Sequence, residues 1–269
     1  MMKKISKNVV LYILFTIIVL GCFLYVRFPG RVVQSYLLDT MAERYPAVSL
    51  SLASVSLSFP PGLKMENVVL DFKDNPASGI RLESLRVRPR WTGYFVGRSS
   101  FAINAVAYGG AGQGRVNFAQ LMPDKIPTSA EIKLENLNLA KIAYLKEKLG
   151  RQIGGKLSGV FTYRGDSQLD FDVQNGTYQL VDKLLGFDRL DFSKAVGQIT
   201  LKGGLLKINK LKLTGDKINF SLKGDIVLNP DFINSAINLT GTMELVAVNS
   251  KKISLSITGT IGNAQTKYL

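Results

Sequence analysis

Three segments near the end of the sequence alternate apolar and polar residues, and each carries a glycine where an apolar residue is due. The glycines are Gly224, Gly241 and Gly259. Strict alternation is typical of a β-strand with one apolar and one polar face. The segments therefore predict antiparallel strands that share an apolar groove lined by Ile218, Phe220, Leu222, Ile226, Leu228, Ile237, Leu239, Met243, Leu245, Ile253, Leu255, Ile257 and Ile261.

The three glycines have two interpretations. A glycine inside a strand costs stability and often marks a bend or a bulge. Kinks at these positions would curve the sheet and turn its apolar faces towards each other. Alternatively, Gly224-Asp225 and its two Gly-Thr counterparts are tight hairpin turns between much shorter strands. We favour kinked strands, because the alternation continues across each glycine.

The same alternation recurs from residue 48 onward, so the predicted fold class is mainly β. We expect a long, curved, mostly antiparallel sheet, forming a groove or half-barrel, with one or two short helices. Residues 31–45 and 139–149 have the apolar spacing of such helices. The clusters Gly109–Gly114 and Asn175–Gly176 predict hairpin turns.

The N-terminal segment Val9–Val26 is uncharged and strongly apolar. As a helix its 18 residues would extend about 27 Å, close to the thickness of a bilayer's hydrocarbon core. The basic tail before it favours a cytoplasmic N-terminus, and hence a single-pass inner-membrane protein with its bulk in the periplasm. The predicted organisation is a cytoplasmic tail (1–8), a transmembrane helix (9–26), a juxtamembrane helix (27–46) and a periplasmic β domain (47–269).

A cleaved signal is the alternative for this segment. Val19-Leu20-Gly21-Cys22 is similar to a lipoprotein cleavage box, in which the cysteine is acylated after processing. The apolar run continues past Cys22, which favours the uncleaved anchor. Both interpretations leave the protein attached to a membrane.

The chain contains no histidine and one cysteine. This composition excludes Ser-His and Cys-His catalysis, histidine-ligated metals and structural zinc sites. We therefore expect no enzymatic activity, no catalytic residues, no cofactor and no metal. The net charge of +14 favours anionic partners, but nucleic acid is not expected outside the cytoplasm.

Several motifs together resemble a known family. They are Phe59-Pro60-Pro61-Gly62-Leu63, Leu149-Gly150, Gly155-Lys156-Leu157-Ser158-Gly159, and the tail Gly197–Ile208 with Leu211–Gly215 and Leu222–Ile226. The chain resembles the type II secretion system protein N family (GspN), whose periplasmic part is AsmA-like. The resemblance implies a non-enzymatic accessory component of type II secretion that contacts other envelope proteins. Its AsmA-like side implies the alternative of a lipid-binding or lipid-transfer protein that holds phospholipid acyl chains in an apolar groove.

Overall fold

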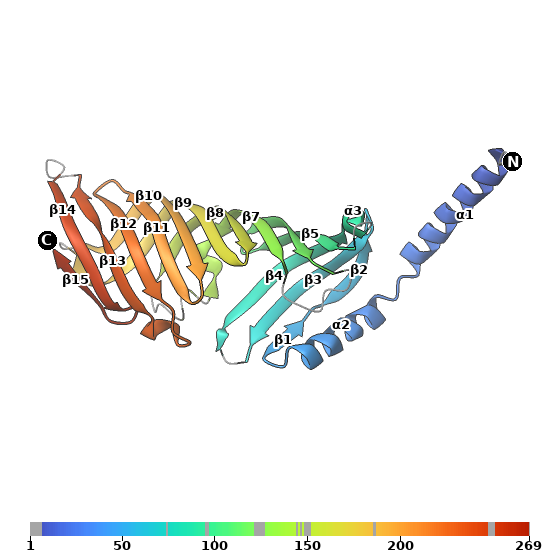
Figure 1. Cartoon of the computed structure of the whole chain (residues 1–269), viewed down its shortest axis with the longest axis horizontal. Coiled ribbons are helices and arrows are strands. Elements are labelled where there is room, and N and C mark those ends of the chain that lie inside the picture. Colours follow the sequence, from blue (N-terminus) through green and yellow to red (C-terminus); the bar gives the residue numbers. More distant parts are fainter. Residues whose placement is uncertain are drawn as a thin grey trace.

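A computed structural model describes residues 7–73, 75–94, 97–120, 127–143, 145, 147, 152–184, 187–246 and 251–268. The described chain forms one open, curved, antiparallel sheet of 15 strands, preceded by two helices (Figure 1). The strands are β1 (Val48–Ser51), β2 (Ser54–Ser58), β3 (Gly62–Phe72), β4 (Asn75–Pro89), β5 (Ser99–Ala107), β6 (Gly110–Phe118), β7 (Ser129–Asn138), β8 (Ile153–Arg164), β9 (Asp166–Leu184), β10 (Phe187–Lys202), β11 (Leu205–Thr214), β12 (Ile218–Val227), β13 (Ala236–Leu245), β14 (Lys251–Thr260) and β15 (Ala264–Tyr268). The predicted mainly-β class and curved antiparallel sheet are confirmed.

The sheet is a simple meander. From β3 to β15, each strand pairs with the next one along the chain. At the N-terminal end β3 is shared: β2 pairs with its first half and β1 with its second half. This order needs only short connections, so strands adjacent in sequence are also adjacent in space.

Two helices lead into the sheet, and short helical turns interrupt it. The helices are α1 (Lys7–Val26) and α2 (Gly30–Arg44), and the short elements are α3 (Trp91–Tyr94), η1 (Leu139–Lys141) and η2 (Phe232–Asn234). Figure 1 shows α1 projecting away from the sheet at the N-terminal end, with α2 lying beside β1. The helix predicted over 139–149 begins with η1. Residues 143, 145 and 147 are helical, and residues 144, 146, 148 and 149 lie outside those described.

Helix α2 covers the first strands of the sheet. Its Val33, Leu37 and Leu38 pack on a core that contains the buried Leu52, Val55, Met65 and Val68. The helix begins close to β2, since a Cβ at Gly30 would overlap the carbonyl oxygen of Val55. The amphipathic spacing seen in the sequence therefore reflects an ordinary sheet-covering helix, as the sequence favoured.

The three C-terminal glycines lie within continuous strands. Pairing continues in register through Gly224, Gly241 and Gly259, so the hairpin-turn alternative is excluded. Gly224 and Gly259 have φ values of 144° and 109°, a region open mainly to glycine. Whether these residues bend their strands stays a prediction.

Of the two other turn predictions, the one at Gly109–Gly114 is confirmed only at its first residue, and the one at Asn175–Gly176 is wrong. Only Tyr108 and Gly109 form the turn between β5 and β6, and residues 110–114 belong to β6. Asn175 and Gly176 lie inside the long strand β9, where the register with β8 shifts. Gly110, Gly114 and Gly176 lie where a Cβ would overlap a neighbouring strand, so they are needed for close strand packing rather than for a reversal of the chain.

Within the described part of the chain, no helix is both long enough and apolar enough to cross a bilayer. The transmembrane anchor expected over residues 9–26 therefore stays a prediction.

Candidate functional site

The register of the sheet brings apolar residues from nearly every strand into one unbroken row. Each member is the direct cross-strand partner of the next, from β2 to β15. This first row is Val55, Met65, Leu85, Ala105, Gly112, Leu134, Gly159, Phe171, Gly197, Leu211, Leu222, Gly241, Leu255 and Tyr268.

A second row runs beside the first, two residues along each strand or three where a bulge intervenes. It is Leu57, Leu63, Val87, Ile103, Gly114, Ile132, Phe161, Leu169, Ile199, Ile208, Gly224, Leu239 and Ile257, and it ends at Thr266 on β15. Side chains two residues apart on a strand share a face. The two rows therefore define one apolar face, about 60 Å long at the usual spacing between strands.

Glycines alternate with large side chains in the middle of the first row. Phe171 on β9 has Gly159 of β8 as one partner and Gly197 of β10 as the other. A Cβ at position 197 would overlap the Phe171 ring, so the ring lies over the glycine backbone. The glycines thus make room for neighbouring bulky residues on the same face.

Each end of the apolar face contains a buried core, and the middle carries both buried and half-buried residues. Helix α2 covers the N-terminal end. At the C-terminal end Ile218, Met243 and Leu255 form a second buried core. Between them, Val173, Ala195 and Ile208 are buried. Ile132, Phe161 and Leu169 are half-buried. Among the described residues, no second sheet packs on this face. Large apolar surfaces are often sites of interaction.

The residues predicted to line the groove all lie at the C-terminal end of this face. Those that are buried are Ile218, Ile237, Leu239, Met243 and Leu255. Those that are half-buried are Phe220, Leu222, Ile226, Leu228, Leu245, Ile253, Ile257 and Ile261. Leu228 and Ile261 lie just beyond the ends of β12 and β14. Sequence reasoning missed the continuation of the face through β2–β11, although alternation was visible in most of those strands.

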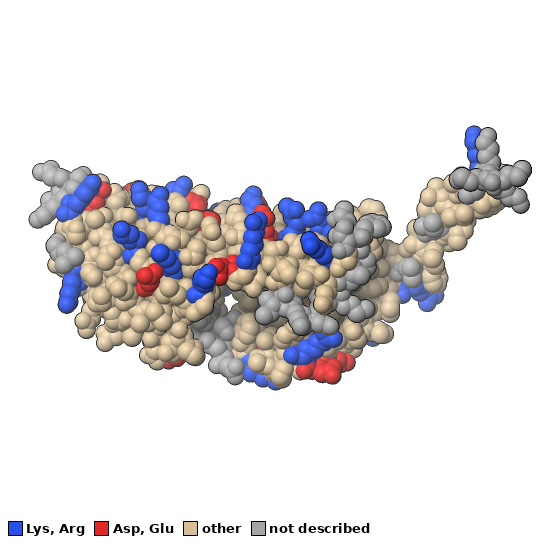
Figure 2. Space-filling model, in the orientation of Figure 1, with Lys and Arg blue, Asp and Glu red and all other residues tan. Residues whose placement is uncertain are grey.

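The opposite face of the sheet is polar. It carries ion pairs between Lys133 and Glu135 (2.7 Å) and between Lys194 and Asp172 (3.2 Å). Figure 2 shows Lys and Arg side chains spread along this molecule, with fewer Asp and Glu among them. We call the face of the sheet that carries these two ion pairs the polar face.

The described residues contain no group of three or more Cys, Asp or Glu side chains that could hold a metal ion. No family model, curated protein or solved structure matches the chain.

Proposed function

We propose that this protein binds the acyl chains of lipids along its apolar face. The observation that carries the proposal is the pair of unbroken apolar rows, which continue through 13 successive strands before the second row meets Thr266. A folded protein gains nothing from a continuous apolar surface of this length unless that surface is covered. An extended hydrocarbon chain has the shape and chemistry to cover it.

The energetics agree with an acyl ligand. Each methylene removed from water contributes about 0.8 kcal/mol. The half-buried residues in the middle, such as Ile132, Phe161 and Leu169, offer apolar contacts without polar groups that would have to be desolvated. We expect binding to depend on chain length more than on the identity of the polar headgroup.

We further propose that α1 attaches the protein to a bilayer. Its described apolar side chains are largely exposed, and those of Leu14, Phe15 and Ile18 are 54%, 65% and 55% exposed. Lys7 begins the helix and Arg27 follows it. In Figure 2 the body of this helix carries almost no charge, while basic side chains lie at its two ends. Such a distribution suits insertion among acyl chains with contacts to anionic headgroups.

The experiment is native mass spectrometry of the full chain, released from detergent, with lipid extraction of the same sample. We expect co-purified lipid with the wild-type chain and substantially less with Ile132→Gln, which places an amide on the apolar face. Glu131→Gln is the matched control, because this exposed neighbour lies on the polar face of the same strand. A lipid-free wild-type protein, or equal losses in both variants, would contradict the proposal.

The type II secretion role implied by the resemblance stays a prediction. It expects this chain to co-purify with envelope proteins of that system, and its gene to lie beside those for a secretion ATPase and pseudopilins.

A further inference from the structure

Two cavities meet where α1 approaches the first strands of the sheet. The first, of about 640 Å³, is an apolar chamber. One wall is the C-terminal half of α1, with Ile18, Cys22 and Val26, and the other is the end of β2 and the turn after it, with Leu57 and Phe59.

The second cavity, of about 450 Å³, is a polar chamber with basic residues. Lys64 and Arg86 line it, together with Ser56 of the edge strand β2. Tyr25, Leu57, Ser58 and Phe59 line both cavities. An apolar chamber therefore adjoins a cationic one across a shared wall.

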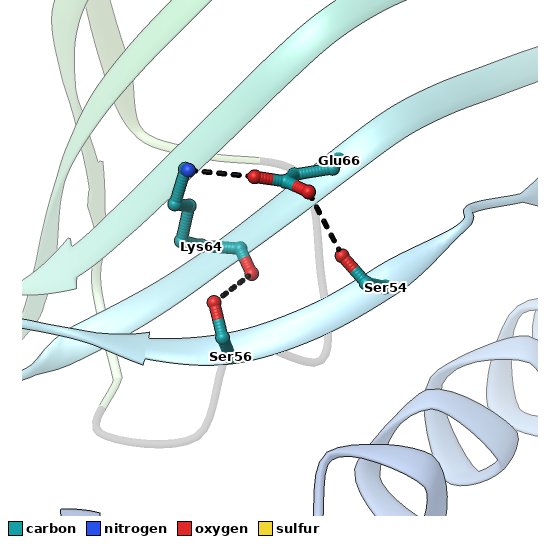
Figure 3. Close-up of polar contacts among 4 residues, drawn as sticks. All are labelled: Ser54, Ser56, Lys64 and Glu66. Carbon is teal, nitrogen blue, oxygen red and sulfur yellow. Dashed lines mark hydrogen bonds and ion pairs between the residues drawn. The ribbon is translucent and has the colours of Figure 1, made fainter.

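Two cationic side chains, Lys64 and Arg86, line the polar chamber, and the charge of Lys64 is neutralised. Lys64 Nζ lies 2.6 Å from Glu66 Oε1, and Ser54 Oγ donates to Glu66 Oε2 at 3.2 Å (Figure 3). The hydrogen bond and charge of Lys64 hold the pKa of Glu66 below its ordinary value, with a smaller contribution from Ser54. Glu66 is thus ionised at neutral pH and offsets Lys64. Arg86 has no ion-pair partner among the residues that the structure describes.

Ser58, on the shared wall, has a buried hydroxyl that lacks a hydrogen-bond partner among the described residues. It is 6% exposed, and within the described structure its Oγ makes no hydrogen bond. Its partner across the sheet is Gly62, and Arg88 lies against Gly62 on the other side. Arg88 Nε is also buried, and no described residue bonds to it. Buried polar groups without partners are uncommon and call for an explanation. A ligand that carries acceptor oxygens would supply one.

We propose that this junction is a binding site for one anionic phospholipid molecule, with its phosphate on Arg86 and Lys64 and its first acyl segments in the apolar chamber. A guanidinium is suited to two hydrogen bonds with one phosphate. The site deepens the proposed function, on which it rests, by giving the chain a place where a membrane lipid is taken up beside the membrane-attaching helix.

The unique cysteine supplies the readout. Cys22 lines the apolar chamber and is exposed, so a bound acyl segment should protect it from alkylation. The full chain in neutral-detergent micelles is treated with N-ethylmaleimide in the presence of a phosphatidylglycerol, a diacylglycerol with the same acyl chains, or inorganic phosphate. We expect protection by the phosphatidylglycerol only. Equal protection by diacylglycerol would mean that the site binds only apolar chains. Equal protection by inorganic phosphate would mean that it binds only anions. Either result would overturn the proposal.

Variants define the headgroup contacts. Arg86→Gln should raise the phosphatidylglycerol concentration needed for half-protection by about tenfold, since a charge-assisted contact is lost. Glu66→Gln should lower the phosphatidylglycerol concentration needed for half-protection, because the charge of Lys64 is no longer neutralised. Lys210→Gln, at an exposed lysine on β11, is the control and should change nothing. Equal effects of Arg86→Gln and Lys210→Gln would overturn the assignment.

Ser58→Ala separates a ligand contact from a structural role. We expect weaker protection of Cys22 with an unchanged or higher melting temperature, because the variant removes a buried hydroxyl that has no partner in the protein. Unchanged protection would overturn the role of Ser58. Ile132→Gln should leave Cys22 protection intact, so failure of this site and failure of acyl binding on the apolar face can be distinguished.

Discussion

The ring of Phe171 lies against the backbone of Gly197, its direct partner across β9 and β10, in the space that a Cβ would need. Gly159 is its partner on the other side. A bulky residue flanked by glycines keeps the first row continuous in the middle of the sheet. The pairing explains why glycine is needed at places where no turn occurs.

Gly197→Ala should destabilise the protein by about 1–3 kcal/mol, because the new methyl group overlaps the Phe171 ring. Gly112→Ala is the matched control: it lies in the same row, and its Cβ would meet only Leu134 Cδ2, at an ordinary 3.6 Å. Chemical denaturation of the full chain measures both. Phe171→Leu should recover part of the loss from Gly197→Ala. Additive effects in that double-mutant cycle would show that the two residues are not coupled.

Gly224→Ala should also lower the free energy of unfolding, but through backbone strain. The residue has φ of 144°, and an added Cβ would overlap Asn238 O on β13. Backbone strain of this kind costs about 1–3 kcal/mol. The same denaturation experiment compares it with Gly112→Ala, and equal midpoints for the two variants would refute the strain argument.

Met243→Ala should lower the free energy of unfolding by about 2–5 kcal/mol, the range for large-to-small changes in a core. Met243 is 0% exposed at the centre of the C-terminal core. Val227→Ala, at a 57% exposed residue on the neighbouring strand β12, should cost much less. If the two losses matched, the C-terminal end of the apolar face would not be packed as described.

The pKa of Glu66 should rise in Lys64→Gln, because the hydrogen bond and charge that lower it are removed. A carboxyl with a lowered pKa contributes stability above its ordinary pKa, and this contribution disappears as the pH falls through the lowered value. Carbon-13 NMR titration of the Glu66 carboxyl in both proteins measures the change. An unchanged pKa would mean that Lys64 does not contact Glu66 in solution.

Leu14→Asp should weaken attachment to the membrane, because a carboxylate within an apolar helix costs about 3 kcal/mol at the centre of a bilayer. Leu205→Asp, at an exposed apolar residue of β11, is the control and should leave attachment unchanged. Flotation with phosphatidylglycerol-containing vesicles measures the bound fraction. Equal flotation of the Leu14→Asp and wild-type chains would contradict a role for α1.

Alternation was sufficient to predict the β-class, the antiparallel sheet and the strands around Gly224, Gly241 and Gly259. Alternation could not reveal the two rows, because the rows depend on the register between strands. The alternation within one strand does not determine that register. The cluster at 109–114 illustrates the difficulty. Glycines suit turns and close strand packing equally well, and only the structure shows that Gly114, paired with Ile103 and Ile132, serves the second purpose, since a Cβ there would overlap Glu131 O.

The junction at α1 was also beyond sequence reasoning. Cys22 attracted attention as a lipidation signal, and nothing in the sequence places it near Leu57 or Phe59. The pattern Arg86-Val87-Arg88 predicts an exposed strand face, but Arg86 and Arg88 are half-buried. The proximity of Arg86 to Tyr25 depends on the direction in which α1 leaves α2. Contacts of this kind come from tertiary structure and have no periodic signature.

The most direct test of acyl binding on the apolar face is photocrosslinking of the full chain to a phospholipid that carries a diazirine in one acyl chain, followed by peptide mapping. The account predicts adducts on half-buried members of the second row, such as Ile132, Phe161 and Leu169. Adducts confined to α1, or found on polar-face residues such as Thr162, would contradict it.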